Sequence, residues 1–281
     1  MRVDNWTLSA TGLAFDRNWM VTSKDGIGLL QKRCARLCFI EALVDREAQT
    51  LSLSAPELLV SSVQVPLCSS DLLSDQQRVC SDRVSTADCG DAVAAWLESA
   101  IEESGCRLRR QTDEIERSSR RNPGDRVSLV NEAQYLLINR ASVRVLSEIV
   151  GIGEDELVGR FRPNFVVDGL EPFAEEACNS IQIASLSFKV VGLCTRCQMI
   201  CIDQSTGQKD TGLLTALRDS RQGRKLTFGV YLSLSCEEDA AISVATDGLA
   251  QGVMFSVGDK RAAFKIECSD TPPHVRLCPT Y

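Results

Sequence analysis

Two cysteines three residues apart, Cys194 and Cys197, lie on either side of an arginine at position 196. Thiolates bind soft metals and attack electrophilic sulfur, and a guanidinium binds phosphate through its bidentate fork. The pattern is compatible with three kinds of site: structural zinc, a redox-active thiol pair, or a single thiolate ligand beside a cation that binds an anionic cofactor.

The surrounding sequence argues against the first two. A structural zinc site usually needs two such cysteine pairs or a pair plus histidines, whereas the chain has no second CxxC and one histidine, His274. A redox pair sits at the start of a helix, where the dipole activates the thiol, but residues 198–202 have the pattern of a strand. Two interpretations remain open: Cys197 is a cofactor ligand, or both cysteines are buried thiols next to a surface arginine.

Two further polar segments interrupt apolar surroundings. Arg162 and Asn164 lie two residues apart at the entry to an expected strand, so both side chains can project from one face. Asp16 and Arg17 interrupt another apolar stretch. An ordinary ion pair at the end of a strand also explains each of these segments when it is considered by itself.

Five segments considered together are more specific, because they occur in one order along the chain. They resemble the C-terminal portion of the molybdenum cofactor sulfurases, in which an N-terminal β-barrel domain precedes a MOSC domain. The resemblance covers about residues 3–232 and rests on FDRNWM at 15–20, DRVSTADCG at 82–90, SLVNEAQY at 128–135, RPN at 162–164 and CTRCQMICID at 194–203.

This resemblance implies a domain that binds the molybdopterin-type molybdenum cofactor and takes part in its sulfuration, the exchange of a molybdenum oxo ligand for sulfur. That reaction activates xanthine dehydrogenase and aldehyde oxidase, the implied client enzymes. Position by position, it implies that Cys197 ligates molybdenum and carries out the transfer, and that Cys194 is either an accessory persulfide carrier or a plain buried thiol. The side chains implied to line the pterin and phosphate are those of Arg17, Asn131, Asn164, Thr195 and Arg196, with Arg162 adjacent.

Elementary chemistry agrees with these roles. A pterin phosphate is a compact dianion that one or two arginines and backbone N–H groups can bind even in an acidic protein. A cation at Arg196 should favour the thiolate of Cys197, as a metal ligand or a sulfur nucleophile requires.

Two other functions remain open. The first is a molybdenum-dependent reductase of N-hydroxylated compounds with a haem or flavin electron partner, although residues 198–203 look more like the sulfurase. The second is a non-catalytic carrier of the cofactor.

The resemblance also has limits. The family's opening strand, with a Lys-Ser pair near the cofactor, would precede Met1, and the final strand expected after residue 259 gives way to an unfamiliar sequence. The desulfurase domain of the full sulfurases, which uses pyridoxal phosphate, does not fit in this chain. We therefore expect it to accept sulfur from that domain or another persulfide donor, but not to draw sulfur from free cysteine.

Composition sets the broad class. The 281 residues are 44% hydrophobic, enough for one large or two smaller globular domains, and no apolar run approaches the roughly 20 residues of a membrane span. The N-terminus resembles neither a signal nor a transit peptide, so we expect a soluble cytoplasmic protein without a membrane partner. An odd count of 13 cysteines favours reduced, mostly buried thiols, and a net charge of -7 disfavours nucleic-acid binding.

The elements that must position these residues are mainly strands. We expect a mixed α+β, predominantly β fold: an N-terminal β-barrel-like domain at 1–110, a linker or exposed loop at 111–126, a MOSC-type β barrel with peripheral helices at 127–260 and an atypical tail at 261–281.

In the first domain, Asp25-Gly26 supplies the positive φ angles of a tight turn between strands at 19–22 and 27–32. Apolar spacing predicts a helix over 91–103 that Gly105 can end. The basic residues 107–126 lack periodicity and read as a solvated linker rather than a phosphate site. Further strands are expected at 37–44, 50–54 and 61–66.

The second domain begins with a strand at 135–138. A helix should run from a Ser142 cap to Val150, burying Val143, Leu146 and Ile149, with Gly151 after its end. The remaining strands are expected at 165–167, 180–183, 186–191, 199–202 and 227–232.

Overall fold

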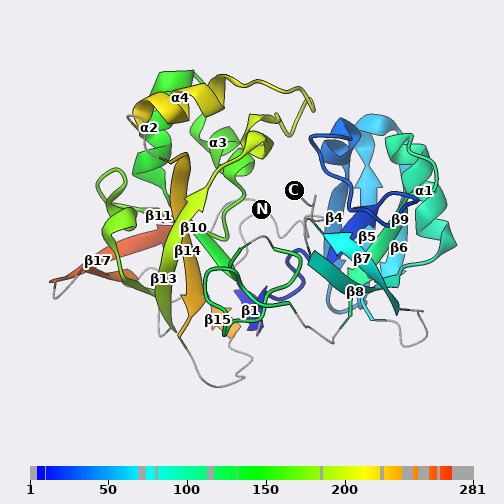
Figure 1. Ribbon diagram of the computed structural model, residues 1–281, viewed down its shortest axis with the longest axis horizontal. Helices are drawn as coiled ribbons and strands as arrows, with labels where there is room; N and C mark the ends of the chain where they lie inside the picture. Colours follow the sequence, from blue (N-terminus) through cyan, green and yellow to red (C-terminus); the bar gives the residue numbers. More distant parts are fainter. Residues whose placement is uncertain are drawn as a thin grey trace.

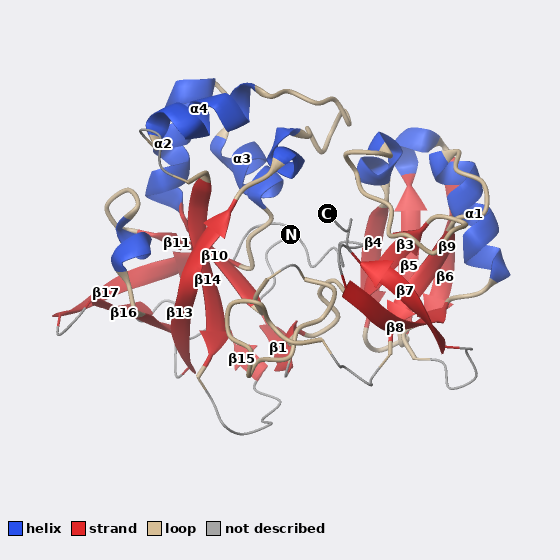
Figure 2. Cartoon of the chain, in the orientation of Figure 1, coloured by secondary structure: helices blue, strands red, loops and turns tan. Residues whose placement is uncertain are grey.

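The structure, a computed structural model, has two lobes joined by polypeptide that passes between them more than once (Figure 1). It describes residues 5–9, 11–68, 74–79, 82–112, 117–130, 132–183, 186–221 and 225–235, and the backbone of the strands at 243–245, 253–257 and 260–267. Strands outnumber helices in both lobes (Figure 2), which confirms the predicted mixed, predominantly β fold class.

Two sheets and a helix build the N-terminal lobe. One sheet has the strand order β3 (Trp19–Thr22), β9 (Arg107–Gln111), β8 (Asp82–Asp88), β7 (Ser74–Val79), and the other has β4 (Glu41–Asp45), β5 (Thr50–Ala55), β6 (Val60–Pro66). Helix α1 (Asp91–Ile101) packs against β6 and β9, and the 3-10 helices η1 (Ala35–Phe39) and η2 (Pro56–Leu58) lie in the connections. Trp19, Leu97 and Leu108 are fully buried where these elements meet.

The local expectations for this lobe are met in part. The turn that contains Gly26 closes through the hydrogen bond from the Ser23 N–H to the Ile27 carbonyl, 2.8 Å, and Gly26 has φ +70, but Asp25 does not have the positive φ angle that was predicted for it. The predicted strand at 27–32 is wrong, because Ile27 and Gly28 make isolated bridges and a turn follows. Helix α1 ends earlier than predicted, at Ile101, with left-handed Glu102 rather than Gly105 as its cap. Residues 35–39 form η1 instead of the start of a strand.

The largest error concerns the arginine-rich segment after α1. Residues 107–111 form β9, an internal strand, instead of the start of an exposed linker. Leu108 and Gln111 are buried, while Arg107 and Arg109 bind carboxylates of β8 and β7. Leu108 is the only apolar residue in this strand, so the sequence has no clear alternation of apolar and polar residues from which the strand could be predicted.

The C-terminal lobe is built on a closed barrel of seven strands. Their order is β10 (Tyr135–Asn139), β11 (Phe165–Asp168), β17 (Lys260–Glu267), β16 (Val253–Val257), β12 (Ser180–Ile183), β13 (Leu186–Thr195), β14 (Thr227–Leu234), with β10 and β11 parallel and the other pairs antiparallel. Gly229 lets β14 approach β10, since a Cβ there would lie 2.5 Å from the Leu137 carbonyl oxygen. The rings of Tyr135, Phe165 and Phe188 contact one another in the barrel core.

Strand β17 corrects the expectation that the last strand is missing. Its backbone pairs with both β11 and β16, so that residues 260–267 close the barrel. The sequence of this segment is unfamiliar, yet strand pairing uses main-chain groups that every non-proline residue carries.

Three helices gather at one end of the barrel (Figure 1). They are α2 (Arg140–Val150), α3 (Glu154–Phe161) and α4 (Gly212–Ser220), accompanied by the 3-10 helices η3 (Ala174–Ala177) and η4 (Gln198–Cys201). The cap of α2 is Asn139, whose side chain accepts from the Ala141 N–H at 3.0 Å, and not the predicted Ser142. Gly151 ends α2 as expected, whereas Ile149 is 53% exposed rather than buried. In the part of the chain that the structure describes, no helix is long and apolar enough to cross a bilayer.

The beginning of the chain lies with the C-terminal lobe. Strand β1 (Asn5–Ser9) pairs with β15 (Ser243–Ala245) and with β2 (Gly12–Leu13), and Leu8 is buried in the barrel core. The chain then crosses to the N-terminal lobe through residues 14–18. This crossing brings Arg17 to the junction between the lobes.

Candidate functional site

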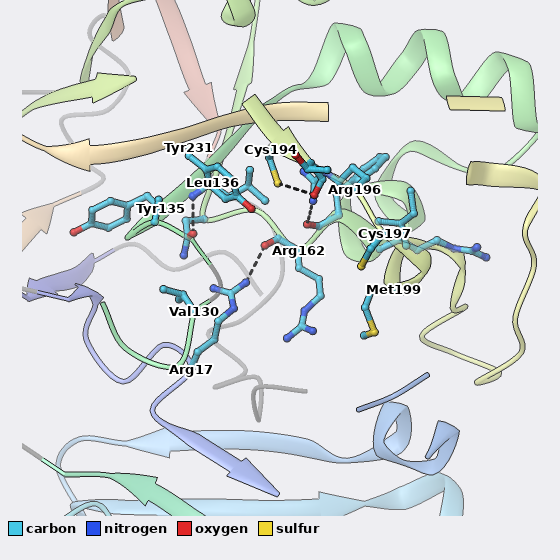
Figure 3. Close-up of a pocket in the computed structure, with 16 residues that line it drawn as sticks. Arg17, Val130, Tyr135, Leu136, Arg162, Cys194, Arg196, Cys197, Met199 and Tyr231 are labelled. Carbon is cyan, nitrogen blue, oxygen red and sulfur yellow. Dashed lines mark hydrogen bonds between the residues drawn. The ribbon is translucent and has the colours of Figure 1, made fainter. Parts of the chain in front are cut away.

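A pocket at the junction of the lobes collects most of the predicted site residues (Figure 3). Its lining comes from the crossing segment after β2, from the turn after α3, and from the end of β13 with the start of η4. Those predicted residues that line it are Arg17, Arg162, Asn164, Cys194, Thr195, Arg196 and Cys197. Asn131, the remaining predicted residue, lies outside the described residues.

The two cysteines of the motif differ sharply in environment. Cys197 is exposed at the end of β13, whereas the Cys194 side chain is buried under Tyr231 and Leu136. Burial raises the pKa of the Cys194 thiol, and of the two thiols only that of Cys197 is exposed. Among the described residues, no group of three or more His, Cys, Asp or Glu side chains could hold a metal ion.

The segment after Cys197 is a 3-10 helix, not the predicted strand. Cys197 is the N-terminal cap of η4, and Ile200 and Cys201 turn inward against α3 and α4. Residues 199–202 are four consecutive apolar residues, and so short an apolar run is compatible with either a strand or a helical turn. The sequence prediction failed for this reason. Because a helical turn does follow Cys197, the lack of a helix no longer speaks against a redox pair. The two thiols still differ, since Cys194 is buried and Cys197 is exposed.

Arg196 has main-chain partners on the inside of the pocket wall. Its Nε and Nη2 donate to the Phe228 carbonyl at 2.9 and 2.6 Å, and its Nη1 donates to the Phe161 carbonyl at 3.1 Å. The guanidinium also lies over the Phe161 ring, 4.9 Å from its centroid. These contacts fasten β13 to α3 and β14. A contact of Arg196 with phosphate stays a prediction.

Asn164 also has a full set of partners. Its side-chain oxygen accepts from the Leu136 N–H at 2.9 Å, and its amide nitrogen donates to the Asp16 carboxylate at 3.0 Å. Arg17 forms an ion pair with Asp16 and donates to the Arg162 carbonyl at 3.0 Å. The predicted pair at residues 16 and 17 therefore exists, and it joins the two lobes.

The other two predicted residues reach the pocket from opposite walls. Thr195 is the last residue of β13 and is exposed. Arg162 is half-buried and ends α3 in a left-handed conformation, with φ 56. In the view of Figure 3, its side chain lies between those of Arg17 and Met199.

The sequence reasoning missed Arg160, which also lines the pocket. This side chain is 5% exposed and binds Glu156 at 2.6 Å and Asp203 at 3.6 Å. Its Nη1 is buried and has no hydrogen-bond partner among the described residues. The available signal was the Glu156–Arg160 spacing of four residues after an acidic first turn, which marks helix α3.

The wall is chemically suited to an anion. It contains four arginines (Arg17, Arg160, Arg162 and Arg196), and no aspartate or glutamate among the described residues lines it. The enclosed space is about 90 Å³, within a hollow of about 730 Å³ that includes the mouth open to solvent. A ligand of cofactor size would therefore lie in the mouth, where Cys197 is exposed, instead of being fully enclosed.

Comparison with known proteins assigns families to both lobes. The description "MOSC N-terminal beta barrel domain" matches residues 1–104, and "MOSC domain" matches residues 124–259. Together these two regions include every described residue of the pocket.

Three curated relatives illustrate what the chain is similar to. The chain is 42% identical over 82% of its length to a molybdenum cofactor sulfurase of Danio rerio, 37% identical over 88% to that of Homo sapiens, and 38% identical over 86% to that of Drosophila willistoni. It spans 30% of the length of each of these relatives.

Proposed function

The chain belongs to the MOSC family, as a homologue of the molybdenum cofactor sulfurases, and from this premise we propose that it binds the molybdopterin-type molybdenum cofactor at the junction pocket and takes part in its sulfuration. The observation that carries this proposal is an exposed thiol, Cys197, at the mouth of a pocket whose charged lining is exclusively arginine among the described residues. The cofactor is an anion with a high-valent metal that thiolates can ligate, so the arginines match its anionic part and Cys197 matches its metal.

Each part of the wall has a role in this proposal. Cys197 binds the metal or receives sulfur, because its thiol is accessible both to the pocket and to solvent. Arg17 and Arg162 bind the anionic part of the cofactor, with Thr195 as a hydroxyl donor. Arg196 and Asn164 hold these groups in place through their main-chain partners.

When bound, the cofactor would supply the molybdenum centre whose ligand is exchanged. This chain's own contribution is to bind and orient it and to present the Cys197 sulfur. Sulfur would come as the terminal atom of a persulfide, from a desulfurase domain that uses pyridoxal phosphate or from another donor. Attack by the Cys197 thiolate moves that atom to Cys197 and releases the donor as a thiolate. The clients in this proposal are xanthine dehydrogenase and aldehyde oxidase, and the site of action is the cytoplasm.

Loading experiments test the binding half of this function. The purified chain would be incubated with molybdenum cofactor released from a donor enzyme, desalted, and assayed for molybdenum and pterin. We expect the wild type and Cys194→Ser to retain both, and Cys197→Ser to lose most of the molybdenum. A wild type that retains neither component would contradict the proposal.

Persulfide transfer tests the other half. After incubation with a small-molecule persulfide donor, mass spectrometry should find one added sulfur on Cys197 in the wild type and in Cys194→Ser, and none at that position in Cys197→Ser. Turnover of an N-hydroxylated substrate with a chemical reductant, without any sulfur movement, would instead favour a reductase.

A further inference from the structure

The carboxylate of Asp16 links the crossing segment to the C-terminal lobe at the pocket. It forms an ion pair with Arg17 in its own segment and accepts from the side chain of Asn164 across the junction. Both partners of Asp16 line the pocket, whereas Asp16 lies behind them with its side chain 19% exposed. Asp16 thus touches two pocket residues without facing the ligand space.

The backbone around Asp16 is held in an unusual conformation. Phe15 and Arg17, the residues on either side, have positive φ angles of 64 and 53, which cost a residue with a side chain roughly 1 kcal/mol each. Neighbouring groups hold this shape: the Ser128 hydroxyl donates to the Asp16 carbonyl at 3.1 Å, and the Leu129 N–H donates to the Arg17 carbonyl at 3.2 Å. The segment is therefore fixed by contacts from outside it.

We propose that Asp16 is a positioning residue, whose carboxylate holds the Arg17 guanidinium in the pocket wall where the anionic part of the cofactor binds. This inference rests on the proposed function and deepens it. An arginine side chain has four rotatable bonds, and fixing it before the ligand arrives lowers the entropic cost of binding. The Asp16 carboxylate and the Arg162 carbonyl, 3.0 Å from Arg17 Nη2, together fix the plane of the guanidinium.

The substitution Asp16→Asn separates positioning from simple charge. Asn164 and Arg17 donate to the same oxygen of Asp16, Oδ2. The asparagine oxygen can still accept from both of them, but the contact with Arg17 becomes a neutral hydrogen bond and the ion pair is lost. If Asp16 acted only by neutralising Arg17, removing its negative charge would tighten the binding of an anion. Positioning predicts the opposite sign, with affinity for the cofactor weakened about threefold to tenfold because Arg17 must then be ordered on binding.

The matched control is Ser128→Ala. It removes the hydrogen bond to the Asp16 main-chain carbonyl and loosens the same segment, but leaves the carboxylate in place. Cofactor dissociation constants would be measured for the three proteins by quenching of tryptophan fluorescence. We expect Ser128→Ala to stay within about twofold of the wild type, since a neutral hydrogen bond far from the ligand is lost.

A second readout needs no cofactor. In the ligand-free protein, side-chain ¹⁵N resonances of Arg17 should show slow rotation of the guanidinium, and this rotation should become fast in Asp16→Asn. Unchanged rotation, unchanged or tighter binding in Asp16→Asn, or an equal loss in Ser128→Ala would each overturn the inference. A wild type that binds no cofactor would refute the proposed function, while the resonances would still decide whether Asp16 holds Arg17.

Discussion

Two aspartate–arginine pairs, in different regions of the molecule, have different surroundings. On the sheet of the N-terminal lobe, Arg107 binds Asp88 and Asp91, each at 2.7 Å, with its side chain 30% exposed. At the junction, Arg17 binds Asp16 with its side chain 14% exposed, and its other acceptor is a carbonyl of the opposite lobe. The exposed pair exchanges contacts with water for a contact between its own charges, so it adds little stability. The more buried pair holds Arg17 in place at the pocket.

The same contrast applies to the third arginine, Arg196. Its guanidinium donates to the carbonyls of Phe161 and Phe228, so it acts as a brace inside the wall. Arginine side chains thus have different roles in this protein. The role depends on which group accepts their hydrogen bonds and on whether water can compete for those bonds. Four measurements would sharpen or break this comparison.

The largest expected difference is in the reactivity of the two motif cysteines. Iodoacetamide should alkylate Cys197 on the order of 100-fold faster than Cys194, because reaction at the buried thiol requires local opening of the barrel. Peptide mass spectrometry over time would measure both rates. Comparable rates under native conditions would mean that Cys194 is accessible and could act as a carrier.

Arg196→Ala should destabilise the protein strongly. The change leaves two buried carbonyls without donors and removes the stacking on Phe161, at a cost of roughly 3 kcal/mol in the free energy of unfolding. Urea denaturation would measure it. A loss below about 1 kcal/mol combined with a large loss of cofactor binding would instead make Arg196 a direct phosphate ligand.

Arg107→Ala is the counterpart on the sheet surface. Its ion pairs are partly exposed, so the free energy of unfolding should fall by less than about 1 kcal/mol, and cofactor binding should not change. The same denaturation experiment applies. A loss as large as that of Arg196→Ala would remove the distinction between the two regions.

The smallest effect is a pH dependence at Asp88. Burial opposes its ionisation, but hydrogen bonds from Arg107 and from the Gly90 N–H outweigh burial and hold the pKa of Asp88 below its usual range. A lowered folded-state pKa contributes stability above the unfolded-state value of about 4, and this contribution is lost as pH falls through the folded value. Asp88→Asn should therefore lose less stability than the wild type between pH 5 and the acid transition, as followed by thermal unfolding.

Local signals predicted much of the fold. The Asp25-Gly26 turn, Gly151 after α2 and the alternating residues of β5 are short-range features, and each fixes the conformation of its own segment. Elements that depend on distant partners were missed. Strand β9 is stabilised by carboxylates from β7 and β8, and β17 by main-chain pairing with β11 and β16.

The site could be predicted from the sequence only in part. The CTRC motif and the segments around Arg17 and Asn164 named the residues, and the structure brings the described ones together. Their partners could not be inferred, because the carbonyls that receive Arg196 and the contact between Asp16 and Asn164 exist only after two lobes have packed. Arg160 was missed because its helix was not recognised.

The central claim is that the Cys197 sulfur meets the metal of the bound cofactor. Molybdenum X-ray absorption on the cofactor-loaded chain, with Cys197→Ser as the comparison and Cys194→Ser as the control, tests it most directly. The account predicts one more sulfur neighbour of molybdenum in the wild type and in Cys194→Ser than in Cys197→Ser. Identical sulfur coordination of the molybdenum that each of the three proteins retains would contradict it.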